Sequence, residues 1–406
     1  MAVTIFTIGL LVFLAHLFTA VFERTRIPDV LLLMIIGIAA GPVLHIVAPG
    51  DFGKVGAALT TIALTVILFE GGTTLEIPTI IRAASETLML TMVSFIVTAA
   101  IAVGIMMGVF HTDMLTGIVL GTIIGGTSSA VIVPMVHGLK LKEPAGTVLV
   151  LESSLTDVLC IVLVAGVLEA MVSTNSGTGK IIGSILSSFF FATFIGVLGG
   201  HLWLYLLTKV RRFPNTTFTT FAFIFILYGL AEMLGFSGAI TSLSFGVTLT
   251  NFRYFRFNRL PLLKGIEWSR LNETEKQFYA EMVFLVKIFF FIYLGIQMRF
   301  DGWEAFIWPA VIVALIYLAR LIVTRLVVST TIPWYERSVM SVMVPKGLAA
   351  AVLAGLPAQF GIPAAGLIQD MVFRIILISI VLTAVLVPLL DKTPFYRVIF
   401  GGKRSQ

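Results

Sequence analysis

We select seven charged side chains that lie inside long apolar stretches of this sequence, where solubility does not explain them. They are Glu70, Glu152, Asp157, Glu232, Lys287, Arg320 and Lys346. A charged group at the centre of a hydrocarbon layer costs about 2.5–3.5 kcal/mol on insertion scales, so each such group is a candidate functional residue. Buried carboxylates and bases of this kind can bind cations, carry protons or neutralise one another.

Two of the carboxylates share one stretch but face different directions. Glu152 and Asp157 stand in the segment LESSLTD, residues 151–157. Successive residues of a helix are about 100° apart, so the two carboxylates lie about 140° apart around the axis. Thr156 stacks one turn from Glu152, and Ser153 stacks one turn from Asp157. The two carboxylates can therefore serve different partners.

Asp157 has the chemistry of a site where a monovalent cation and a proton replace one another. An alkali cation prefers hard oxygen ligands, and a carboxylate can take up a proton when the cation leaves. The hydroxyl groups of Ser153, Thr156 and residues 127–129 can supply further oxygens. We therefore predict an alkali cation at Asp157, in a cation- and proton-binding set that comprises Asp157, Thr156, Ser153, Glu152, Thr127 and Ser128. No resident cofactor is expected, because the cation and the proton are the substrates.

The buried bases predict a fixed ion pair beside this site. Arg320 is the preferred partner of Glu152, because a guanidinium stays charged and binds a carboxylate through two parallel hydrogen bonds. Lys346 can offset the carbonyl groups at a helix end. Lys287 either lines the ion pathway or extends to the membrane interface. Glu70, beside two glycines, has either a structural hydrogen-bonding role or a pathway role, and both stay open.

The elements that must hold these residues are membrane helices. Of the 406 residues, 58% are hydrophobic and only 12% are charged, whereas a soluble domain carries about 25% charged residues. Runs of about 20 apolar residues, enough to cross a membrane, recur along the whole chain. We predict an all-α polytopic membrane protein with about 13 transmembrane helices, at residues 4–22, 28–47, 55–72, 86–110, 114–138, 145–172, 181–208, 216–234, 236–251, 278–298, 304–329, 337–359 and 366–390.

Basic residues occupy alternate connections between these helices. They gather at residues 24–26, Arg82, 140–142, 209–212, 253–276, Arg337 and in the tail from Lys392 onward. The positive-inside rule then places the N-terminus outside and the C-terminus in the cytoplasm of a cell (inner) membrane. The net charge of +6 therefore reflects membrane topology, so membrane lipid is an expected partner and nucleic acid is not.

Two of the predicted helices contain residues that discourage a continuous helix. One carries Gly125-Gly126 and a hydroxyl-rich segment before Pro134, and the other carries the segment PKG at residues 345–347. Free backbone at membrane depth survives only where protein or a water-filled cavity satisfies it. The spacing of seven helices predicts two inverted six-helix repeats whose broken helices cross at the site. Ordinary kinks are the alternative, because Gly and Pro are common in membrane helices.

The sequence resembles the monovalent cation/proton antiporter superfamily, in particular its sodium/proton exchanger (NhaP-like) branch. Residues 152–157 carry the most specific likeness, to the Glu-Ser-x-x-Asn-Asp element of that branch. Residues 26–42 resemble its early helix, and FEGG at 69–72 resembles its Phe-Glu-Ala-Gly element. LAR at 318–320 and KG at 346–347 resemble its buried-arginine and second-break segments.

The resemblance implies an antiporter fold, a homodimer and an elevator-like movement. It implies a core, ion-binding subdomain at about 86–172 and 304–390 and a dimerisation subdomain at about 1–72 and 181–298, within one transmembrane unit that spans residues 1–406. It also implies that one aspartate, Asp157, binds cation and proton in turn, for transport and pH homeostasis. Because the tail after Lys392 is short, we expect no soluble regulatory domain.

Three departures from the branch bear on selectivity and stoichiometry. Thr156 replaces its usual Asn, residues 127–129 (TSS) replace Thr-Asp-Pro and resemble the potassium-efflux branch, and Lys346 replaces Arg. Sodium is the first expectation, and potassium and lithium are alternatives. Electrogenic relatives carry two adjacent carboxylates where this chain has Thr156 and Asp157, so we expect electroneutral exchange of one cation per proton.

Other functions account for fewer of these features. The chief alternative is a sodium- or proton-coupled symporter of an organic solute on a related inverted-repeat fold. A channel would carry a selectivity-filter element of the Thr-Val-Gly-Tyr-Gly kind, and the sequence has none. It also has no Gly-x-Ser-x-Gly or His-Glu-x-x-His motif, so an enzyme is not expected.

Overall fold

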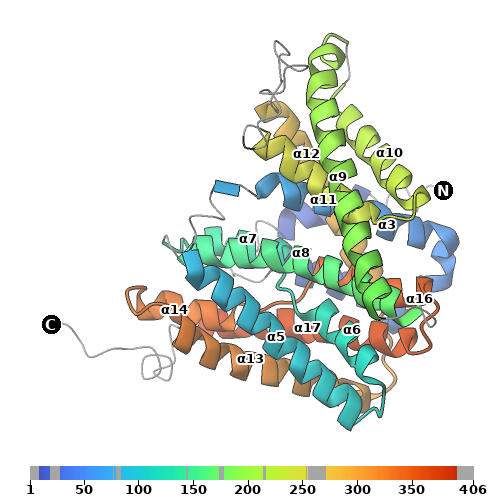
Figure 1. Cartoon of the computed structure of the whole chain (residues 1–406). Coiled ribbons are helices and arrows are strands. Elements are labelled where there is room, and N and C mark those ends of the chain that lie inside the picture. The colour runs from blue at the N-terminus through green and yellow to red at the C-terminus, as the bar shows by residue number, and fades with distance from the viewer. Residues whose placement is uncertain are drawn as a thin grey trace. The chain divides into compact units, whose positions relative to one another are not determined.

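All regular secondary structure is helical in the part of the chain that the structure describes (Figure 1). The computed structural model describes residues 9–18, 28–75, 77–78, 84–142, 145–172, 178–213, 216–252, 254 and 271–390. The predicted all-helical membrane class is confirmed. Four groups of basic residues that set the expected orientation lie outside the described residues, namely residues 24–26, Arg82, most of 253–276 and the tail from Lys392 onward.

The helices follow one another with short connections. The α-helices are α2 (Asp29–Ile38), α3 (Gly53–Thr74), α5 (Ala84–Gly108), α6 (Met114–Ile124), α7 (Ser129–Gly138), α8 (Ala145–Val172), α9 (Thr178–Val210), α10 (Thr219–Met233), α11 (Gly238–Asn251), α12 (Glu273–Gln297), α13 (Ile307–Val327), α14 (Trp334–Val342), α15 (Leu348–Leu353), α16 (Leu356–Gln359) and α17 (Ala365–Leu389). Shorter helical turns are η1 (Ala39–Val43), η2 (Pro49–Phe52) and η5 (Trp303–Phe306).

Seven helical segments of the described residues are long and apolar enough to cross a membrane. They are Thr87–Gly108, Met114–Gly138, Ala145–Leu168, Leu186–Val210, Glu273–Gln297, Trp303–Val327 and Ala365–Leu389. Shorter apolar helices cover Gly9–Phe18, Asp29–Val43, Ala58–Thr74, Thr219–Met233 and Leu348–Gln359. Each predicted span overlaps a described helix, so the runs of apolar residues located the elements to within a few residues.

The chain forms two compact units. Unit 1 comprises Met1–Gly56, Ala83–Met171 and Ile288–Gln406, and unit 2 comprises Ala57–Arg82 and Val172–Lys287. The two segments expected to form the core subdomain fall in unit 1, apart from Val172. Unit 1 also takes in residues 1–56 and 288–298, which the sequence grouped with the dimerisation subdomain. The division of labour between a core and a dimerisation subdomain stays a prediction.

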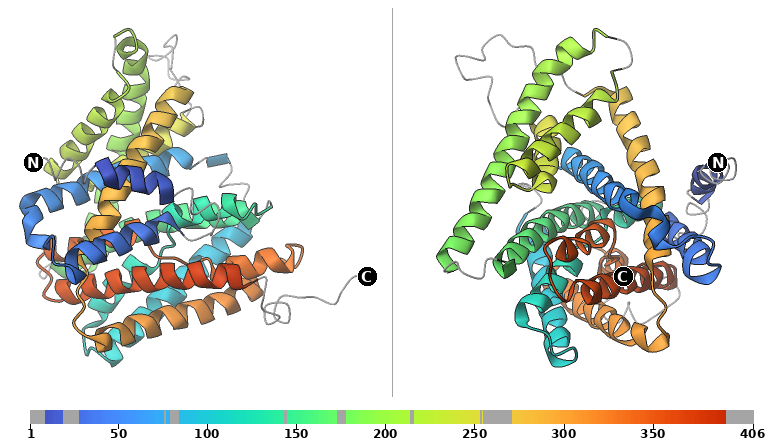
Figure 2. Two further views of the ribbon diagram at one scale, coloured as in Figure 1. Left: turned by 180° about the vertical axis from the view of Figure 1, so that it is seen from behind. Right: turned by 90° about the vertical axis from the view of Figure 1, so that its right-hand side faces the viewer.

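Small residues let the helices of unit 1 approach closely. A Cβ atom at Gly121 of α6 would lie 2.7 Å from the Cα atom of Ala99 on α5, and one at Gly117 would lie 2.9 Å from the Cα atom of Val103. Such small-residue contacts replace the hydrophobic effect, which is weak between helices in lipid. Helix α13 packs against both α5 and α17 (Figure 2). This packing fixes the end of α6, where the first interruption begins.

Unit 2 has its own polar anchor at the ends of α3 and α11. Asn251 donates from its side-chain amide to the carbonyl oxygen of Leu75 at 2.6 Å and accepts from the backbone N–H of Ile77 at 2.8 Å. Thr250 donates to the carbonyl oxygen of Thr73 at 2.7 Å. These bonds satisfy backbone groups that the end of α3 leaves free.

Candidate functional site

The two interruptions predicted from the sequence are present, and they meet within unit 1. The first lies between α6 and α7, and the second separates α14 from α15. The backbone N–H of Ser128, in the first, donates to the carbonyl oxygen of Pro345, in the second, at 2.7 Å. A Cβ atom at Gly347 would collide with the Ser128 side chain. Glycine is therefore the residue that allows the two non-helical segments to cross this closely.

Asp157 projects from α8 toward this crossing. Its Oδ2 atom accepts a hydrogen bond of 3.0 Å from the hydroxyl group of Ser129, the first residue of α7. Asp157 lines a cavity together with Thr127, Ser128 and Gly347. The cavity offers about 10 Å³ to the centre of a water molecule, which is room for about one water. A dehydrated alkali cation fits a space of this size, and a larger solute does not.

The hydroxyl groups around Asp157 divide into those that hold backbone and those that stay available. Thr156 accepts from the backbone N–H of Thr127 at 3.1 Å and donates to the carbonyl oxygen of Ser153 at 3.0 Å. Ser153 donates to its own helix, to a carbonyl oxygen one turn earlier at 2.9 Å. The hydroxyl group of Ser128 is buried without a hydrogen-bond partner among the described residues. Thr156 thus fixes the first interruption, and Ser128 keeps a free oxygen at the cavity.

Glu152 lies beside this site but contacts a different partner. Both its carboxylate oxygens accept hydrogen bonds from Arg320 of α13, each at 2.5 Å. The two side chains are 1% exposed, so solvent does not screen the pair. Arg320 also donates to the hydroxyl group of Ser94 at 2.7 Å and to the carbonyl oxygen of Met340 at 3.2 Å. These bonds join α5, α8, α13 and α14 around one fixed ion pair.

Lys346 lies in the second interruption, and a hydrogen bond from its side chain stabilises the first one. Its ammonium group donates to the carbonyl oxygen of Gly126 at 3.0 Å, just past the end of α6, and its backbone N–H donates to the hydroxyl group of Ser379 at 2.9 Å. A cation at a helix C-terminus offsets the partial negative charge there. Tyr317 donates to the carbonyl oxygen of Ser379 at 2.9 Å and bonds Thr383 at 2.6 Å. Helices α13 and α17 therefore support the second interruption.

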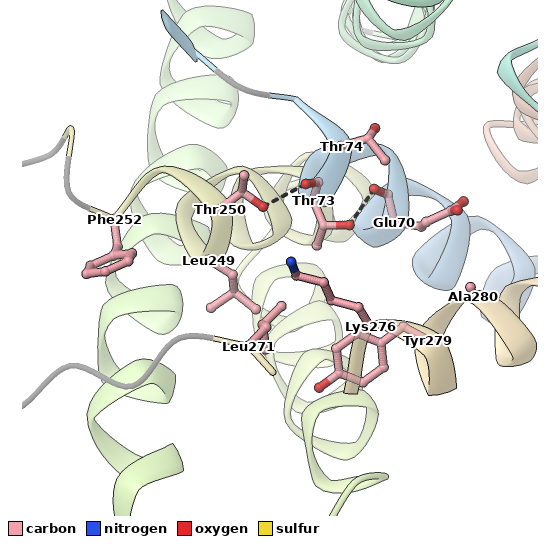
Figure 3. Close-up of a pocket in the computed structure, with 10 residues that line it drawn as sticks. All are labelled: Glu70, Thr73, Thr74, Leu249, Thr250, Phe252, Leu271, Lys276, Tyr279 and Ala280. Atoms are coloured by element: carbon pink, nitrogen blue, oxygen red, sulfur yellow. Dashed lines mark hydrogen bonds between the residues drawn. The ribbon is translucent and has the colours of Figure 1, made fainter. Parts of the chain in front are cut away.

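Glu70 belongs to unit 2 and lines a separate pocket there (Figure 3). The pocket has a volume of about 520 Å³, and its walls include Thr73, Thr250, Lys276 and Tyr279. Figure 3 shows Glu70 on α3 and Lys276 on α12, on facing walls of the pocket. The structure therefore does not place Glu70 among the residues that line the Asp157 cavity.

Lys287 also lies in unit 2, at the end of the part of α12 that belongs to that unit. Its ammonium group lies 5.8 Å from the centre of the Phe284 ring and within electrostatic reach of Glu70. Glu232 accepts a hydrogen bond of 2.7 Å from the backbone N–H of Gly238 and so caps the first turn of α11. Both residues therefore have local partners within unit 2.

Arg374 is a buried base in α17 that was not among the residues predicted from the sequence. This side chain is 8% exposed and donates to Asp301 at 3.2 Å and to the carbonyl oxygen of Arg299 at 3.1 Å. Its guanidinium group stacks over the Phe306 ring at 5.6 Å. A basic residue inside the last predicted span was the available signal. Arg374 therefore links α17 to the segment that precedes α13.

Interrupted helices that meet at buried charges in an all-helical membrane protein are typical of ion-coupled transporters. Residues 9–392 match the family described as sodium/hydrogen exchanger, transmembrane. The chain therefore belongs to the sodium/hydrogen exchanger family, a family of ion transporters and not of enzymes.

Two similar proteins are named as cation/proton antiporters. The K(+)/H(+) antiporter NhaP2 of Shewanella sp. (strain ANA-3) is 24% identical over 92% of this chain. This chain spans 64% of the length of that relative. A probable Na(+)/H(+) antiporter 2 of Methanocaldococcus jannaschii is 23% identical over 82% of this chain and 79% of its own length.

A solved structure shares the fold. The sodium proton antiporter MjNhaP1 of Methanocaldococcus jannaschii superposes with a TM-score of 0.75 at 21% identity. The match covers 95% of this chain and 99% of that one. The likeness therefore extends over nearly the whole of both chains.

Proposed function

We propose that this chain exchanges a monovalent alkali cation for protons across a cell membrane. The cation and the proton occupy the Asp157 carboxylate in turn, and Thr127, Ser128 and Ser129 contribute oxygens around it. Family membership supports an ion transporter. The names of the relatives include both potassium and sodium antiporters, so the proposal extends to both cations, with lithium as a third to be tested.

One observation carries the proposal: Asp157 borders a cavity of single-ion size while the other carboxylate on the same helix is fully engaged. Two hydrogen bonds from Arg320 occupy both oxygens of Glu152. The single hydroxyl of Ser129 bonds one oxygen of Asp157. Asp157 can therefore release a proton and accept a cation without breaking an ion pair, whereas Glu152 cannot.

The presence of a single exchangeable carboxylate at the site supports electroneutral exchange. Residue 156, next to Asp157, is a threonine whose hydroxyl group holds the first interruption. One exchangeable carboxylate carries either one monovalent cation or one proton. Each full cycle then moves one positive charge in each direction, and membrane voltage has no net effect on the equilibrium.

A cavity that holds about one water supports an inorganic cation over an organic solute as the substrate. The symporter alternative would need a pocket of several hundred Å³ at the site. The two interruptions that cross beside this cavity support alternating access over passive conduction.

The wider arrangement follows as part of the proposal. About 13 transmembrane helices form two inverted six-helix repeats, with the N-terminus outside and the C-terminus in the cytoplasm. The core around the site moves like an elevator against a dimerisation part, and two chains form a homodimer. A voltage-sensitive exchange, or a monomer in lipid, would contradict this part of the proposal.

Transport assays in proteoliposomes test the function directly. Sodium, potassium and lithium are added in turn to vesicles that hold a pH gradient, and a trapped dye reports internal pH. We expect at least one cation to collapse the gradient with the wild type, and none to do so with Asp157→Asn or Asp157→Ala.

Asp113→Asn is the matched control, because it makes the same change outside the site. Asp113 caps the start of α6, and asparagine caps a helix about as well as aspartate. This variant should transport like the wild type. No response of the wild type to any of the three cations would refute antiport, and activity in Asp157→Ala would mean that another carboxylate carries the cation.

A further inference from the structure

Cys160 is the single cysteine of the chain, and it lies at the cation cavity. It follows Asp157 by three residues on α8, so the two side chains share a helix face. Cys160 is 1% exposed and lines the same cavity as Asp157. A Cβ atom at Gly126 would lie 2.8 Å from its sulfur atom. The thiol therefore sits directly over the first interruption.

The thiol is only weakly held in place. It donates to the carbonyl oxygen of Ile123 at 3.8 Å, and a thiol is a weak donor. Its electrostatic neighbours are the Asp157 carboxylate and the Lys346 ammonium group. Sulfur is thus available at the wall of a cavity to which Asp157, Thr127 and Ser128 bring oxygen atoms.

A second feature of the cavity also lacks a protein partner. The hydroxyl oxygen of Ser128 is buried, lines the cavity and has no hydrogen-bond partner among the described residues. A buried hydroxyl without a partner is costly unless something else binds it. Together with the carboxylate of Asp157, the oxygen of Ser128 and the sulfur of Cys160 surround one ion-sized space.

We propose that this cavity also binds soft monovalent metal cations such as silver(I), with Cys160 as the sulfur ligand. The proposal rests on the proposed function, since the metal ion enters by the route of the transported cation. Thiolate ligands favour soft cations, whereas carboxylate and hydroxyl oxygens favour hard ones. A silver(I) ion has the same charge as an alkali cation, so the carboxylate admits it and the sulfur retains it.

The binding step is a proton-for-metal exchange at sulfur. The S–H bond of Cys160 breaks, an S–Ag bond forms, and the proton passes to the Asp157 carboxylate. No electron is transferred, and no further reactant is needed. The bound metal then blocks the cavity, and the protonated carboxylate cannot take up an alkali cation. Silver(I) therefore acts as an inhibitor that follows the path of the substrate.

The test measures silver inhibition and silver binding on the same proteins. Wild type and Cys160→Ala are placed in proteoliposomes in nitrate medium, and each is compared with its own transport rate without silver nitrate. Loss of an outer-shell partner already costs a metal site about 10- to 100-fold in affinity, so loss of the sulfur ligand should raise the half-inhibitory silver concentration about tenfold or more. Saturating alkali cation should slow the onset of inhibition in the wild type.

A thiol moved along the same helix is the matched control. Val148 is buried on α8 and does not line the cavity, so Cys160→Ala/Val148→Cys keeps one thiol but displaces it. This variant should stay as resistant to silver as Cys160→Ala. Equal sensitivity of all three proteins would overturn the proposal, as would sensitivity restored by the displaced thiol.

Direct binding separates this proposal from the proposed function. Native mass spectrometry of the detergent-solubilised protein should find one silver ion on the wild type that Cys160→Ala loses, whether or not that variant transports. The transport assay without silver decides the proposed function alone. Silver bound equally by the wild type and Cys160→Ala would refute the site even in a working antiporter.

Discussion

Removing either charge of the Glu152–Arg320 pair should destabilise the protein strongly, and removing both should cost much less than the sum. Both side chains are 1% exposed, and two bonds of 2.5 Å join them. Breaking a buried pair by removing one partner costs about 3–5 kcal/mol, because it leaves an uncompensated charge. We therefore expect Arg320→Met and Glu152→Gln each to lower the free energy of unfolding by about 3–5 kcal/mol.

The double variant leaves no buried charge unpaired, so the free-energy cost of burying a charge without its partner disappears. Contacting residues show coupling energies of up to about 3 kcal/mol, and a fully buried, bidentate pair should lie near that limit. Arg320→Met/Glu152→Gln should thus be about 2–3 kcal/mol more stable than the sum of the single losses predicts. Some loss should remain, because Ser94 and Met340 also lose their bonds to Arg320.

Chemical unfolding in mixed micelles, followed by tryptophan fluorescence, gives the four free energies of this cycle. Arg320→Lys adds a control for geometry, since it keeps the charge but cannot form two parallel bonds. It should fall between the wild type and Arg320→Met. Strictly additive losses would show that the two charges do not stabilise one another. A cost below about 1 kcal/mol for Arg320→Met, which is the range of exposed pairs, would contradict a strong buried pair.

Three further predictions concern the interruptions and the start of α6. Gly347→Ala should lower the transport rate about tenfold or more, because its new methyl group displaces Ser128 at the crossing; unchanged transport in vesicles would contradict this. Lys346→Met should cost about 1–3 kcal/mol in chemical unfolding, since the end of α6 loses a buried donor, and no loss would refute the capping role. Asp113→Ala should cost about 0.5–2 kcal/mol at neutral pH. Hydrogen bonds from Thr116 lower the pKa of Asp113, so this difference should be full above about pH 4 and vanish as the pH falls through the lowered value; a pH-independent difference would contradict the cap.

The sequence alone was enough to locate the helices and to select the charged residues that lie near the crossing of the two interruptions. A charge inside an apolar run is rare because it is costly, so Asp157, Glu152 and Arg320 stand out without any structure. The interruptions could be predicted for a similar reason, since Gly125-Gly126 and Pro345 disfavour helix where the surrounding residues favour it.

The partners of individual hydroxyl groups could not be predicted. The sequence offered Ser153, Thr156 and the hydroxyl groups of residues 127–129 as oxygens for Asp157. In the structure Ser129, from that last group, bonds the carboxylate, whereas Ser153 and Thr156 donate to backbone carbonyls. Which hydroxyl faces the carboxylate depends on where α7 begins, and that register is set by tertiary packing. Hydroxyl residues are also common in membrane helices, so Ser379 gave no distinguishing signal.

Membership of a pocket is likewise a tertiary property. Glu70 met the same sequence criterion as Asp157, a carboxylate in an apolar run, yet it lines a different pocket, in unit 2. Arg374 met the criterion as well and was overlooked near the start of the last span, where it holds a connection by bonds to Asp301 and a backbone carbonyl. Burial of a charge therefore indicates a structural or functional site, and only its neighbours say which.

The proposed exchange requires that Asp157 give up a proton when the cation binds. Proton release on cation addition measures this directly: purified protein in weakly buffered detergent solution is titrated with sodium or potassium, and a pH indicator counts protons against bound cation. We expect about one proton released per cation bound by the wild type, and neither release nor binding by Asp157→Asn. Asp113→Asn should behave like the wild type. Undiminished proton release by Asp157→Asn would contradict the proposed exchange.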